Sequence, residues 1–487
     1  MYLKTLKQLQ QIKNKNLKVG LCHGVFDILH NGHIEHFISA KKQVDILVVS
    51  VTTEKFVNKG PRQPINNDKK RVNMLNSIKY IDYVFLNKDK NSANIIKALK
   101  PDIYFKGPDY LKSDSHGNLK KEIAALKNYK GKIQFTETHQ MSSTSILNNT
   151  VYNWTSEQKN ILKKLGNSNA YEKIIKKINC LSSKSITIIG EPIIDIYNFC
   201  EIKGITTKDP AISTLFKKKL SVAGGVLTIA KIASLFAKQV NLITYGNKKI
   251  LQNFFKDYNN INITNIDAKE RIQIKSRFLN YHRHEKLLQI TNFSENSFSK
   301  NININPFLKK IKTKEIIICD FGLGLFNLER IHDIEKSNFY LHLNVQTNSI
   351  NQGFNLFTKY KNYKYISLDE REWKLGTNSN HLNIEKIKKL IGRKVYASIT
   401  LGSKGSCLLK NNKNIYSPTF VENIKDTTGC GDAYFIITSM LLNVDTDINL
   451  IPFLGNLYAG MHGQNLGNSK IVSKIEFLKN LNSILKF

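Results

Sequence analysis

The sequence predicts an α/β protein with two domains and a helical linker. The chain has 487 residues, more than one ordinary hydrophobic core contains. Short apolar segments alternate with helix-compatible segments up to about residue 149, and a second alternation of this kind begins at Lys184. Residues 150–183 are polar and lysine-rich, with no strand signal. We therefore expect domains at 1–149 and 184–487, joined by a linker at 150–183.

Five short apolar segments predict the strands of the first domain. Helix-compatible segments separate them, so a parallel sheet with helices on its faces is expected. In the linker, residues 156–165 and 171–178 are compatible with helices, and the second domain opens with a strand at 185–190. The five predicted strands are residues 18–22, 45–51, 83–86, 103–105 and 133–135.

The composition is that of a globular protein of the cytoplasm. Hydrophobic residues make up 41% of the chain, and its six cysteines form no Cys-x-x-Cys pair. Scattered cysteines indicate reduced thiols and argue against a disulfide framework or structural zinc. The first seven residues lack the apolar core of a signal peptide, and the longest apolar stretch, near 434–444, is too short to span a bilayer. No membrane insertion is expected.

The net charge of +35 and the pI near 9.7 raise the question of a nucleic-acid or anionic membrane partner. The lysines are mostly dispersed among asparagine and isoleucine, and a short cluster such as residues 217–219 is not a basic arm. This distribution favours a compositionally biased surface that attracts phosphorylated substrates over nucleic-acid binding.

Residues 23–33, His-Gly-Val-Phe-Asp-Ile-Leu-His-Asn-Gly-His, predict a nucleoside-triphosphate site. A helix is expected to begin just after Gly32, and its first turn offers N–H groups and a positive dipole end to phosphate. His30 and His33 are three residues apart, so both imidazoles can face the same ligand. Two plainer interpretations are a pair of hydrogen-bonded turn histidines and a zinc site. The ordered strand, turn and helix disfavour the first, and the lack of a matching Cys or Glu disfavours the second.

Residues 24–33 resemble the signature of the cytidylyltransferase-like nucleotidylyltransferases. The resemblance runs from about Val19 to Leu147, and further motifs recur in family order: Lys59-Gly-Pro-Arg62, a segment from Arg71, Lys106-Gly-Pro-Asp109-Tyr and Ser142-Ser-Thr-Ser-Ile-Leu. It implies a Rossmann-like domain in which His30 and His33 are catalytic and Lys106 and Asp109 bind substrate. Residues implied to bind nucleotide or phosphate are Gly24, Phe26, Asp27, Lys59, Arg71, Ser142, Ser143 and Thr144.

Residues 426–435, Asp-Thr-Thr-Gly-Cys-Gly-Asp-Ala-Tyr-Phe, predict a second phosphate site. Gly429 and Gly431 precede a helix-like apolar run, so free N–H groups could hold a transferring phosphoryl group. Asp432 would stand at the start of that helix, close enough to accept a proton from an attacking hydroxyl. The plainer interpretation is a glycine-flanked helix cap with Asp432 in a favourable first-turn position.

This segment resembles the Asp-Thr-Thr-Gly-Ala-Gly-Asp signature of ribokinase-like sugar kinases. The resemblance spans about Ile186 to Phe487 and includes segments at 190–197, 223–235, 275–278, 320–324, 369–372 and 401–405. It implies a ribokinase-like α/β domain with Asp432 as catalytic residue and Glu372 acting indirectly on magnesium. Residues implied to bind nucleotide or phosphate are Gly402, Gly405, Gly429, Cys430 and Gly431. Residues implied to bind substrate are Asp195, Gly224, Gly225, Thr228 and Arg277.

The sequence departs from the kinase pattern at four positions. Thr228 stands where these kinases usually have a sugar-contacting Asn, Leu323 replaces a Lys, Asp369 replaces an Asn, and Cys430 replaces an Ala. A thiolate beside phosphate is electrostatically disfavoured, so Cys430 is expected to act only as a small side chain. The resemblance further implies a small sheet lid within residues 195–225 and 270–290, through which such domains often form homodimers.

A nucleotidylyltransferase joined to a sugar kinase resembles the bifunctional heptose-phosphate kinase/adenylyltransferases, with the two domains in reverse order. The expected function is two-step activation of a sugar or polyol. ATP phosphorylates it in the second domain, and a nucleoside triphosphate, ATP or CTP, reacts with a sugar phosphate in the first and releases pyrophosphate. Mg²⁺ is the expected cofactor, and the product is an ADP-heptose-like nucleotide sugar for surface glycans.

Two other functions are alternatives to this one. The first is a single-activity, glycerol-phosphate-type cytidylyltransferase whose degenerate kinase-like half binds a ligand or serves a structural role. The second is a basic, nucleic-acid-associated protein, which would show steeply salt-dependent binding.

Overall fold

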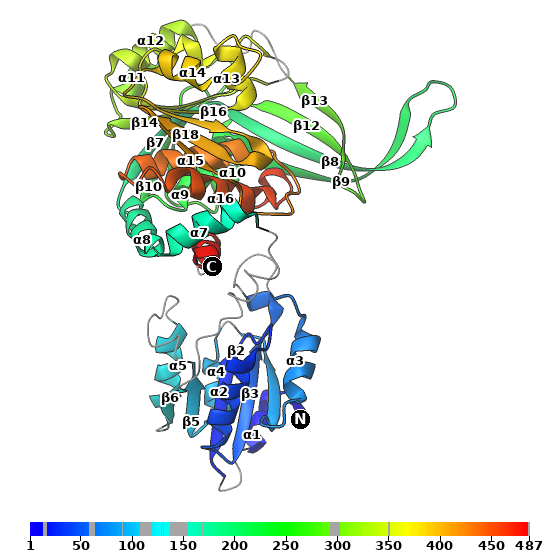
Figure 1. Ribbon diagram of the computed structural model, residues 1–487. Coiled ribbons are helices and arrows are strands. Elements are labelled where there is room, and N and C mark those ends of the chain that lie inside the picture. Colours follow the sequence, from blue (N-terminus) through cyan, green and yellow to red (C-terminus); the bar gives the residue numbers. More distant parts are fainter. Residues whose placement is uncertain are drawn as a thin grey trace. The chain divides into compact units, whose positions relative to one another are not determined.

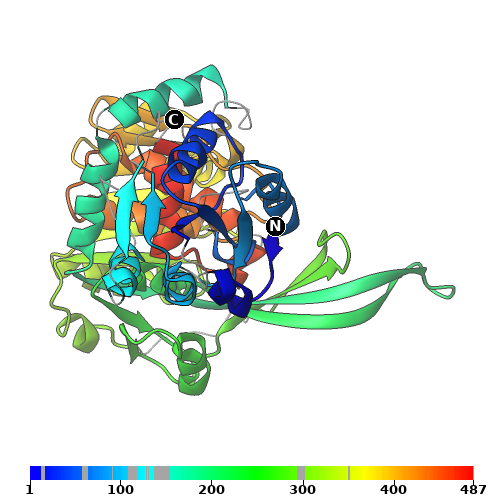
Figure 2. The ribbon, with the colours of Figure 1, turned by 90° about the horizontal axis from the view of Figure 1, so that it is seen from below.

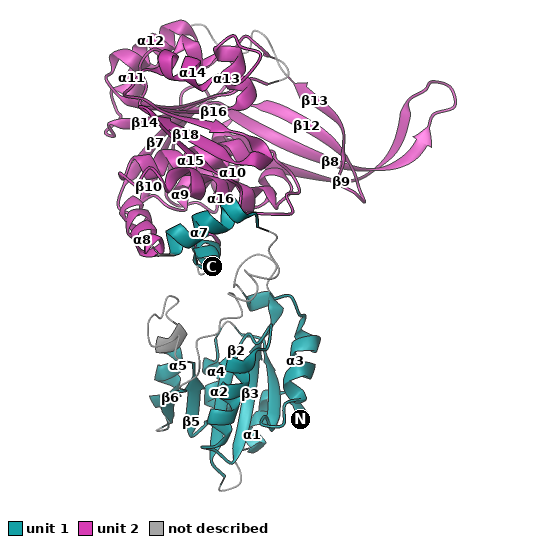
Figure 3. Ribbon diagram, viewed as in Figure 1, with its two compact units in different colours: residues 1–168, 478–487 teal, residues 169–477 magenta. Residues whose placement is uncertain are grey.

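The computed structural model forms two compact units, residues Met1–Ser168 with Leu478–Phe487, and residues Asn169–Phe477 (Figure 3). We describe each unit by itself. The structure describes residues 1–12, 17–57, 64–89, 91–107, 118–127, 129, 131–136, 154–167, 169–292, 302–348 and 351–485.

The first unit contains a six-stranded parallel sheet, as the alternation of apolar segments predicts (Figure 1). Its chain order reverses between β2 and β5, and ligands of open α/β sheets bind beyond the carboxyl ends of the strands at such a point. The two-residue edge strand was not predicted, because it is too short to show a pattern. In spatial order the strands are β1 (Tyr2–Leu3), β4 (Tyr83–Asn87), β3 (Ile46–Thr52), β2 (Val19–Gly24), β5 (Ile103–Lys106) and β6 (Lys132–Phe135).

Helices cover both faces of this sheet. On one face Phe37 of α2 and Leu75 of α3 pack on the sheet, and on the other Leu9 of α1, Leu99 of α4 and Leu126 of α5 do so. The helices of the domain at the sheet are α1 (Leu6–Gln11), α2 (Asn31–Lys41), η2 (Glu54–Phe56), α3 (Asp68–Asn76), α4 (Ala93–Leu99) and α5 (Asn118–Lys127), and α7 (Ser156–Asn167) follows in the predicted linker.

Helix α2 begins two residues earlier than the sequence predicts. His30 has the extended conformation of an N-cap, with φ −140° and ψ 171°, so the first helical residue is Asn31. Gly32 therefore lies inside the first turn and not before it. Both helices expected in the linker are present, α7 and the amphipathic α8 (Ala170–Leu181).

The main sheet of the second unit has nine strands. Seven are parallel, from β11 to β17 in spatial order, and the last two are antiparallel. In that order they are β11 (Ile261–Asn265), β10 (Gln239–Thr244), β7 (Ser185–Gly190), β14 (Glu315–Asp320), β15 (Tyr340–Val345), β16 (Tyr365–Asp369), β17 (Tyr396–Thr400), β18 (Ser406–Lys410) and β19 (Lys413–Ser417).

A separate four-stranded sheet confirms the predicted lid. Its order is β13-β12-β8-β9, with β8 parallel to β12 and antiparallel to β9. The β8–β9 hairpin projects well beyond the main sheet of its unit (Figures 1 and 2). Homodimerisation through the lid stays a prediction. The strands are β8 (Pro192–Ile205), β9 (Ile212–Gly225), β12 (Gln273–Asn280) and β13 (Lys286–Asn292).

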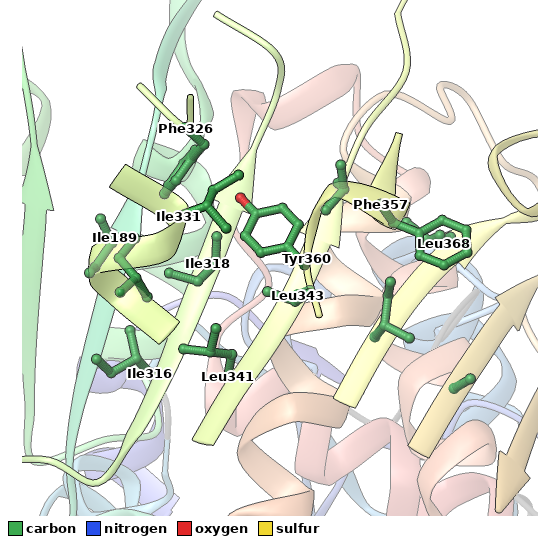
Figure 4. Packing of buried hydrophobic residues seen from close by; sticks show 14 of the residues in the cluster. Ile189, Ile316, Ile318, Phe326, Ile331, Leu341, Leu343, Phe357, Tyr360 and Leu368 are labelled. Carbon is green, nitrogen blue, oxygen red and sulfur yellow. The ribbon is translucent and has the colours of Figure 1, made fainter. Parts of the chain in front are cut away.

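The largest described core of the second unit lies on one face of its main sheet. Ile316 and Ile318 of β14 and Leu343 of β15 pack with Phe326 and Ile331 (Figure 4). On α15, every residue from Asp432 to Leu442 is buried, and this helix packs against α9 and α16. These burials fix the start of α15, where the predicted kinase motif lies.

The remaining elements of the second unit connect and cover its strands. Helix α17 continues past Phe477 into the residues grouped with the first unit. No helix among the described residues is long and apolar enough to cross a bilayer. The elements are α9 (Val226–Ser234), α10 (Lys248–Phe255), α11 (Asn305–Leu308), α12 (Leu328–Lys336), η4 (Phe357–Lys359), α13 (Glu370–Gly376), α14 (Ile384–Ile391), η5 (Gly402–Lys404), α15 (Cys430–Leu442), α16 (Ile451–Gly463), η6 (Gly467–Ser469) and α17 (Lys474–Leu485).

Candidate active sites

The structure brings the two predicted histidines together at the start of α2. The rings of His30 and His33 lie 3.9 Å apart between centroids, at an interplanar angle of 33°. Phe26 packs edge-on against His33, with centroids 5.5 Å apart. The imidazoles therefore stand side by side over a helix N-terminus, the arrangement that the spacing predicts for a phosphate site.

The turn between β2 and α2 is built around Gly24 and Phe26. Phe26 has a positive φ of 47°, and a Cβ at Gly24 would lie 2.8 Å from the Phe26 ring. Only glycine fits at that close approach. The buried Phe26 ring also contacts Phe37 of α2, with centroids 5.2 Å apart. These two residues therefore shape the turn that places the histidines.

Asp27, predicted to bind nucleotide or phosphate, contacts the segment before α3 in this structure. Its carboxylate is buried and accepts hydrogen bonds from the N–H groups of Ile65, at 2.7 Å, and Asn66, at 2.8 Å. Asp27 therefore holds the segment before α3 in place, and its side chain is occupied by that segment.

Arg71, predicted as a phosphate ligand, is fully buried on α3. Its Nη1 donates to the carbonyl oxygens of Val25 and Thr52, both at 2.7 Å, its Nε donates to Asn66, and its Nη2 pairs with Asp68 at 2.5 Å. The guanidinium joins the turn after β2 to the end of β3 and the start of α3. Its donors are occupied by these groups and the side chain is completely buried, so a phosphate contact of Arg71 stays a prediction.

Lys106 is likewise occupied. Its buried ammonium lies 3.1 Å from Glu122 of α5 and 4.9 Å from the centroid of the Tyr104 ring. Burial favours the neutral form of Glu122, but Lys106, His23 and a hydrogen bond from Ser92 together outweigh burial and hold the pKa of this carboxyl below its usual range. A substrate role for Lys106 would require this pair to open.

Five other predicted residues lie outside the described residues: Lys59, Asp109, Ser142, Ser143 and Thr144.

The second unit contains a cavity of about 310 Å³ between the lid and the start of α15. The predicted residues Asp195, Arg277, Glu372 and Asp432 all line it, although they come from four separate segments. Gly225, Gly429 and Gly431 line it as well. The structure therefore brings most of the predicted kinase site together in one place.

Asp432 lies in the first turn of α15 and is 7% exposed. Burial raises its pKa to about 7, with Lys275 acting in the opposite direction and Asp195 adding to the rise. Gln346 donates a hydrogen bond to Oδ1 at 2.5 Å. A carboxyl that titrates near neutral pH and is held in one orientation is suited to accept a proton from a substrate hydroxyl.

The loop before α15 presents its backbone to the cavity. Gly429 has φ 81°, and a Cβ there would lie 2.3 Å from the Asn468 side chain, whereas Gly431 faces open space. Cys430 lies between them with its Sγ 3.8 Å from the Asp426 carbonyl oxygen, and burial raises its pKa to about 12. The thiol therefore stays protonated, as the sequence predicts.

The opposite wall of the cavity carries a buried ion pair. Arg277 of β12 donates to Asp195 of β8 at 2.5 Å, and Asn468 donates to the other Asp195 oxygen at 3.4 Å. A Cβ at Gly224 would lie 2.5 Å from that oxygen, so only glycine lets β9 pass this close to the carboxylate.

Five residues of the predicted kinase site are not among the described residues that line the cavity: Gly224, Thr228, Gly402, Gly405 and Cys430. Thr228 is completely buried, and its hydroxyl donates to the Ala223 carbonyl oxygen at 2.7 Å, so its contact with substrate stays a prediction. Gly402 and Gly405 have positive φ values of 60° and 103° and form the turn of η5. Neither is among the described residues that line the cavity.

Glu372 lines the cavity, but backbone groups occupy its oxygens. They accept hydrogen bonds from the N–H groups of Thr347 and Asp369, both at 2.9 Å. Burial and the neighbouring Asp369 raise the pKa of Glu372 to about 8. Among the described residues, no three or more His, Cys, Asp or Glu side chains form a metal-binding group. Any contact of Glu372 with a metal would therefore be indirect.

Sequence reasoning missed several residues of this site. Gln346, Asn468 and Lys275 line the cavity. Glu191 is completely buried and accepts hydrogen bonds from the N–H groups of Phe321, Leu323 and Leu325, which shapes the loop after β14. The signal for Glu191 was present, because an acid directly after a buried apolar strand needs a local partner.

Two family profiles match the chain. Residues 21–149 match the profile described as cytidylyltransferase-like, and residues 183–435 match that of the pfkB family of carbohydrate kinases. The second match covers more than half of the chain. The chain therefore belongs to the pfkB carbohydrate kinase family and carries a cytidylyltransferase-like domain before the kinase domain.

Similar proteins agree with this division. The first domain is similar to bifunctional protein HldE of Campylobacter fetus subsp. fetus, with 38% identity over 108 residues, covering 22% of this chain and 24% of the relative. HldE of Helicobacter pylori strain Shi470 is 37% identical over 114 residues, covering 23% and 25%. The chain thus spans about a quarter of the length of these curated relatives.

Among solved structures, phosphofructokinase-2 from Escherichia coli, in complex with substrates and products, resembles the chain with a TM-score of 0.50 and 13% identity. The similarity covers 61% of this chain and 99% of that one. At this identity it shows a shared fold only.

We expect Arg71→Met to destabilise the first unit while sparing nucleotide affinity in the folded protein. The change leaves buried carbonyl oxygens of Val25 and Thr52 without their donor, at a cost of about 2–4 kcal/mol. Calorimetric unfolding of the full chain, with the exposed Lys70→Met as matched control, measures the effect. An unchanged unfolding midpoint together with weaker nucleoside-triphosphate binding would instead make Arg71 a phosphate ligand.

Proposed function

We propose that the chain is a bifunctional enzyme that phosphorylates a sugar or polyol with ATP and transfers a nucleotidyl group to a sugar phosphate. The main support is Asp432, a buried carboxyl with a pKa near 7 beside the glycine-rich loop, in a cavity that also contains Asp195 and Arg277. The paired imidazoles of His30 and His33 support the second activity. The names of the bifunctional relatives are consistent with this pairing.

In the kinase step, Asp432 accepts the proton of a substrate hydroxyl, whose oxygen attacks the γ-phosphorus of ATP. The new O–P bond forms as the bond to the β-phosphate oxygen breaks, and ADP leaves. The amides of Gly429 and Gly431 are proposed to hold the transferring phosphoryl group. Glu372 would act on Mg²⁺ indirectly, and bound Mg²⁺ would neutralise phosphate charge.

The lid side of the cavity favours a phosphorylated acceptor. Lys275 and Arg277 both line it, and only Asp195 on the same wall pairs with Arg277 among the described residues. Burial lowers the pKa of Lys275 because it disfavours the charged ammonium. A bound anion would stabilise that charged form. An acceptor such as a heptose phosphate would supply the missing negative charge.

In the nucleotidyl step, a phosphate oxygen of the sugar phosphate attacks the α-phosphorus of ATP or CTP, and pyrophosphate leaves. His30 and His33 would hold the triphosphate over the start of α2. Lys59 and residues 142–144 are proposed to complete this site. The product would be a nucleotide sugar of the ADP-heptose kind, made in the cytoplasm for surface glycans.

The alternative is a cytidylyltransferase with an inactive kinase-like domain, favoured by the inward-turned Thr228 hydroxyl. It predicts pyrophosphate release from a sugar phosphate with no ATP consumption on any acceptor. A screen of the full chain distinguishes the two. It crosses ATP and CTP with ribose, fructose 6-phosphate, heptose phosphates and glycerol 3-phosphate, and measures ADP and pyrophosphate separately.

We expect His33→Ala to lower pyrophosphate release at least a hundredfold while phosphorylation continues, because one of two paired imidazoles is lost from the triphosphate site. Glu35→Ala is the matched control, because residues two apart on a helix face different directions. Loss of both activities in His33→Ala, or retained pyrophosphate release, would contradict the assignment.

We expect kcat/KM for phosphorylation to rise about tenfold per pH unit up to about pH 7 and then level off, because the ionised form of Asp432 is the proton acceptor. Asp432→Asn should abolish this pH dependence and lower kcat/KM for phosphorylation at least a hundredfold. Initial rates of ADP release over pH 5 to 9, with the Asp445→Asn variant as control, measure both. A full rate in Asp432→Asn would remove this residue from the mechanism.

A further inference from the structure

The loop that precedes α15 is organised by a second carboxylate, Asp426. Its Oδ1 accepts hydrogen bonds from the N–H of Thr428, at 3.1 Å, and from the Thr428 hydroxyl, at 2.9 Å. Cys430 continues the turn by donating its N–H to the Thr427 carbonyl oxygen at 3.1 Å. The orientation of the amides at residues 429–431 therefore depends on how Asp426 is held.

The lid reaches this carboxylate with two of its strands. Lys286 of β13 places its Nζ 2.7 Å from Asp426 Oδ1 and 3.0 Å from the Thr428 hydroxyl. Tyr197 of β8 donates its hydroxyl to Asp426 Oδ2 at 3.3 Å. The Asp426 side chain is 3% exposed, whereas that of Lys286 is 45% exposed. The half-exposed Lys286 side chain thus extends from the lid and places its ammonium against the buried Asp426 carboxylate.

An ammonium at this place has an electrostatic consequence. Burial alone would favour the neutral carboxyl, but Lys286 and the Thr428 amide outweigh it and hold the pKa of Asp426 below its usual range. A buried carboxylate without a cation, three residues before the Gly429 amide, would repel the phosphoryl group that these amides are proposed to bind. The contact between Lys286 and Asp426 therefore both neutralises the carboxylate and holds the loop in its shape.

We propose that Lys286 is a positioning residue for phosphoryl transfer: it carries a positive charge on the lid that completes the anion-binding loop only when the lid lies against it. The inference rests on the proposed kinase function. It implies that an acceptor-bound lid and a competent phosphoryl site form together, because one lysine belongs to both.

In the full chain, Lys286→Ala should lower kcat for ADP release about 10- to 100-fold, with KM for ATP changed much less, because the loop acts on the transferring group. Lys286→Arg should keep most of the rate, and added propylammonium should partly restore Lys286→Ala. Lys217→Ala, which removes a lid lysine paired with Glu201, is the matched control and should behave like the unaltered chain. Pyrophosphate release should not change.

A second measurement needs no acceptor. Hydrogen exchange of the ligand-free chain should become faster at residues 426–433 in Lys286→Ala and stay unchanged there in Lys217→Ala. Unchanged exchange at 426–433, or a lost kcat that neither arginine nor propylammonium recovers, would overturn the role of Lys286. If the unaltered chain phosphorylates no acceptor, the proposed kinase function fails, and the exchange experiment still decides whether Lys286 holds the loop.

Discussion

In both units, the position of the candidate site depends on the parallel sheet. Parallel strands end at one edge, and the helices that follow them begin there, so backbone N–H groups gather at that edge. In the first unit β2 leads to α2 and the His30–His33 pair. In the second, the ends of β15 and β16 face the start of α15 across one cavity. Anion binding is therefore a property of the topology, and side chains adapt it to different reactions.

Charge burial then separates the roles of two aspartates in one short segment. Asp426 and Asp432 are both buried, yet their pKa values shift in opposite directions. Asp426 has a lysine ammonium and two Thr428 donors, so it remains an anion with a structural role. Asp432 has one amide donor from Gln346 and a more distant Lys275, so burial dominates and its pKa approaches 7. Two buried aspartates of one segment are thus suited to different roles: Asp426 to a fixed anion and Asp432 to a proton acceptor.

The strands and the lid could be predicted from the sequence because they leave local signals, and the two phosphate sites were proposed from similar signals. Apolar runs mark buried strands, and glycines and histidines before a helix mark its N-terminus. The burial of Arg71 could not be predicted, because it follows from tertiary contacts with the distant Val25 and Thr52 carbonyl oxygens. Gln346 and Lys286 went unnoticed for the same reason, since each meets its aspartate across more than 80 residues of chain.

Three departures from the kinase pattern concern side chains that have no part in the proposed phosphoryl transfer. Thr228 bonds the Ala223 carbonyl oxygen, Leu323 is 6% exposed, and Cys430 keeps a protonated thiol. None of these side chains supplies a group to the reaction, so their replacement leaves proton acceptance and the amide loop intact. Thr228 alone stands where these kinases usually have a sugar-contacting Asn. Acceptor choice therefore falls to the lid wall, where Arg277 and its neighbours carry the charge.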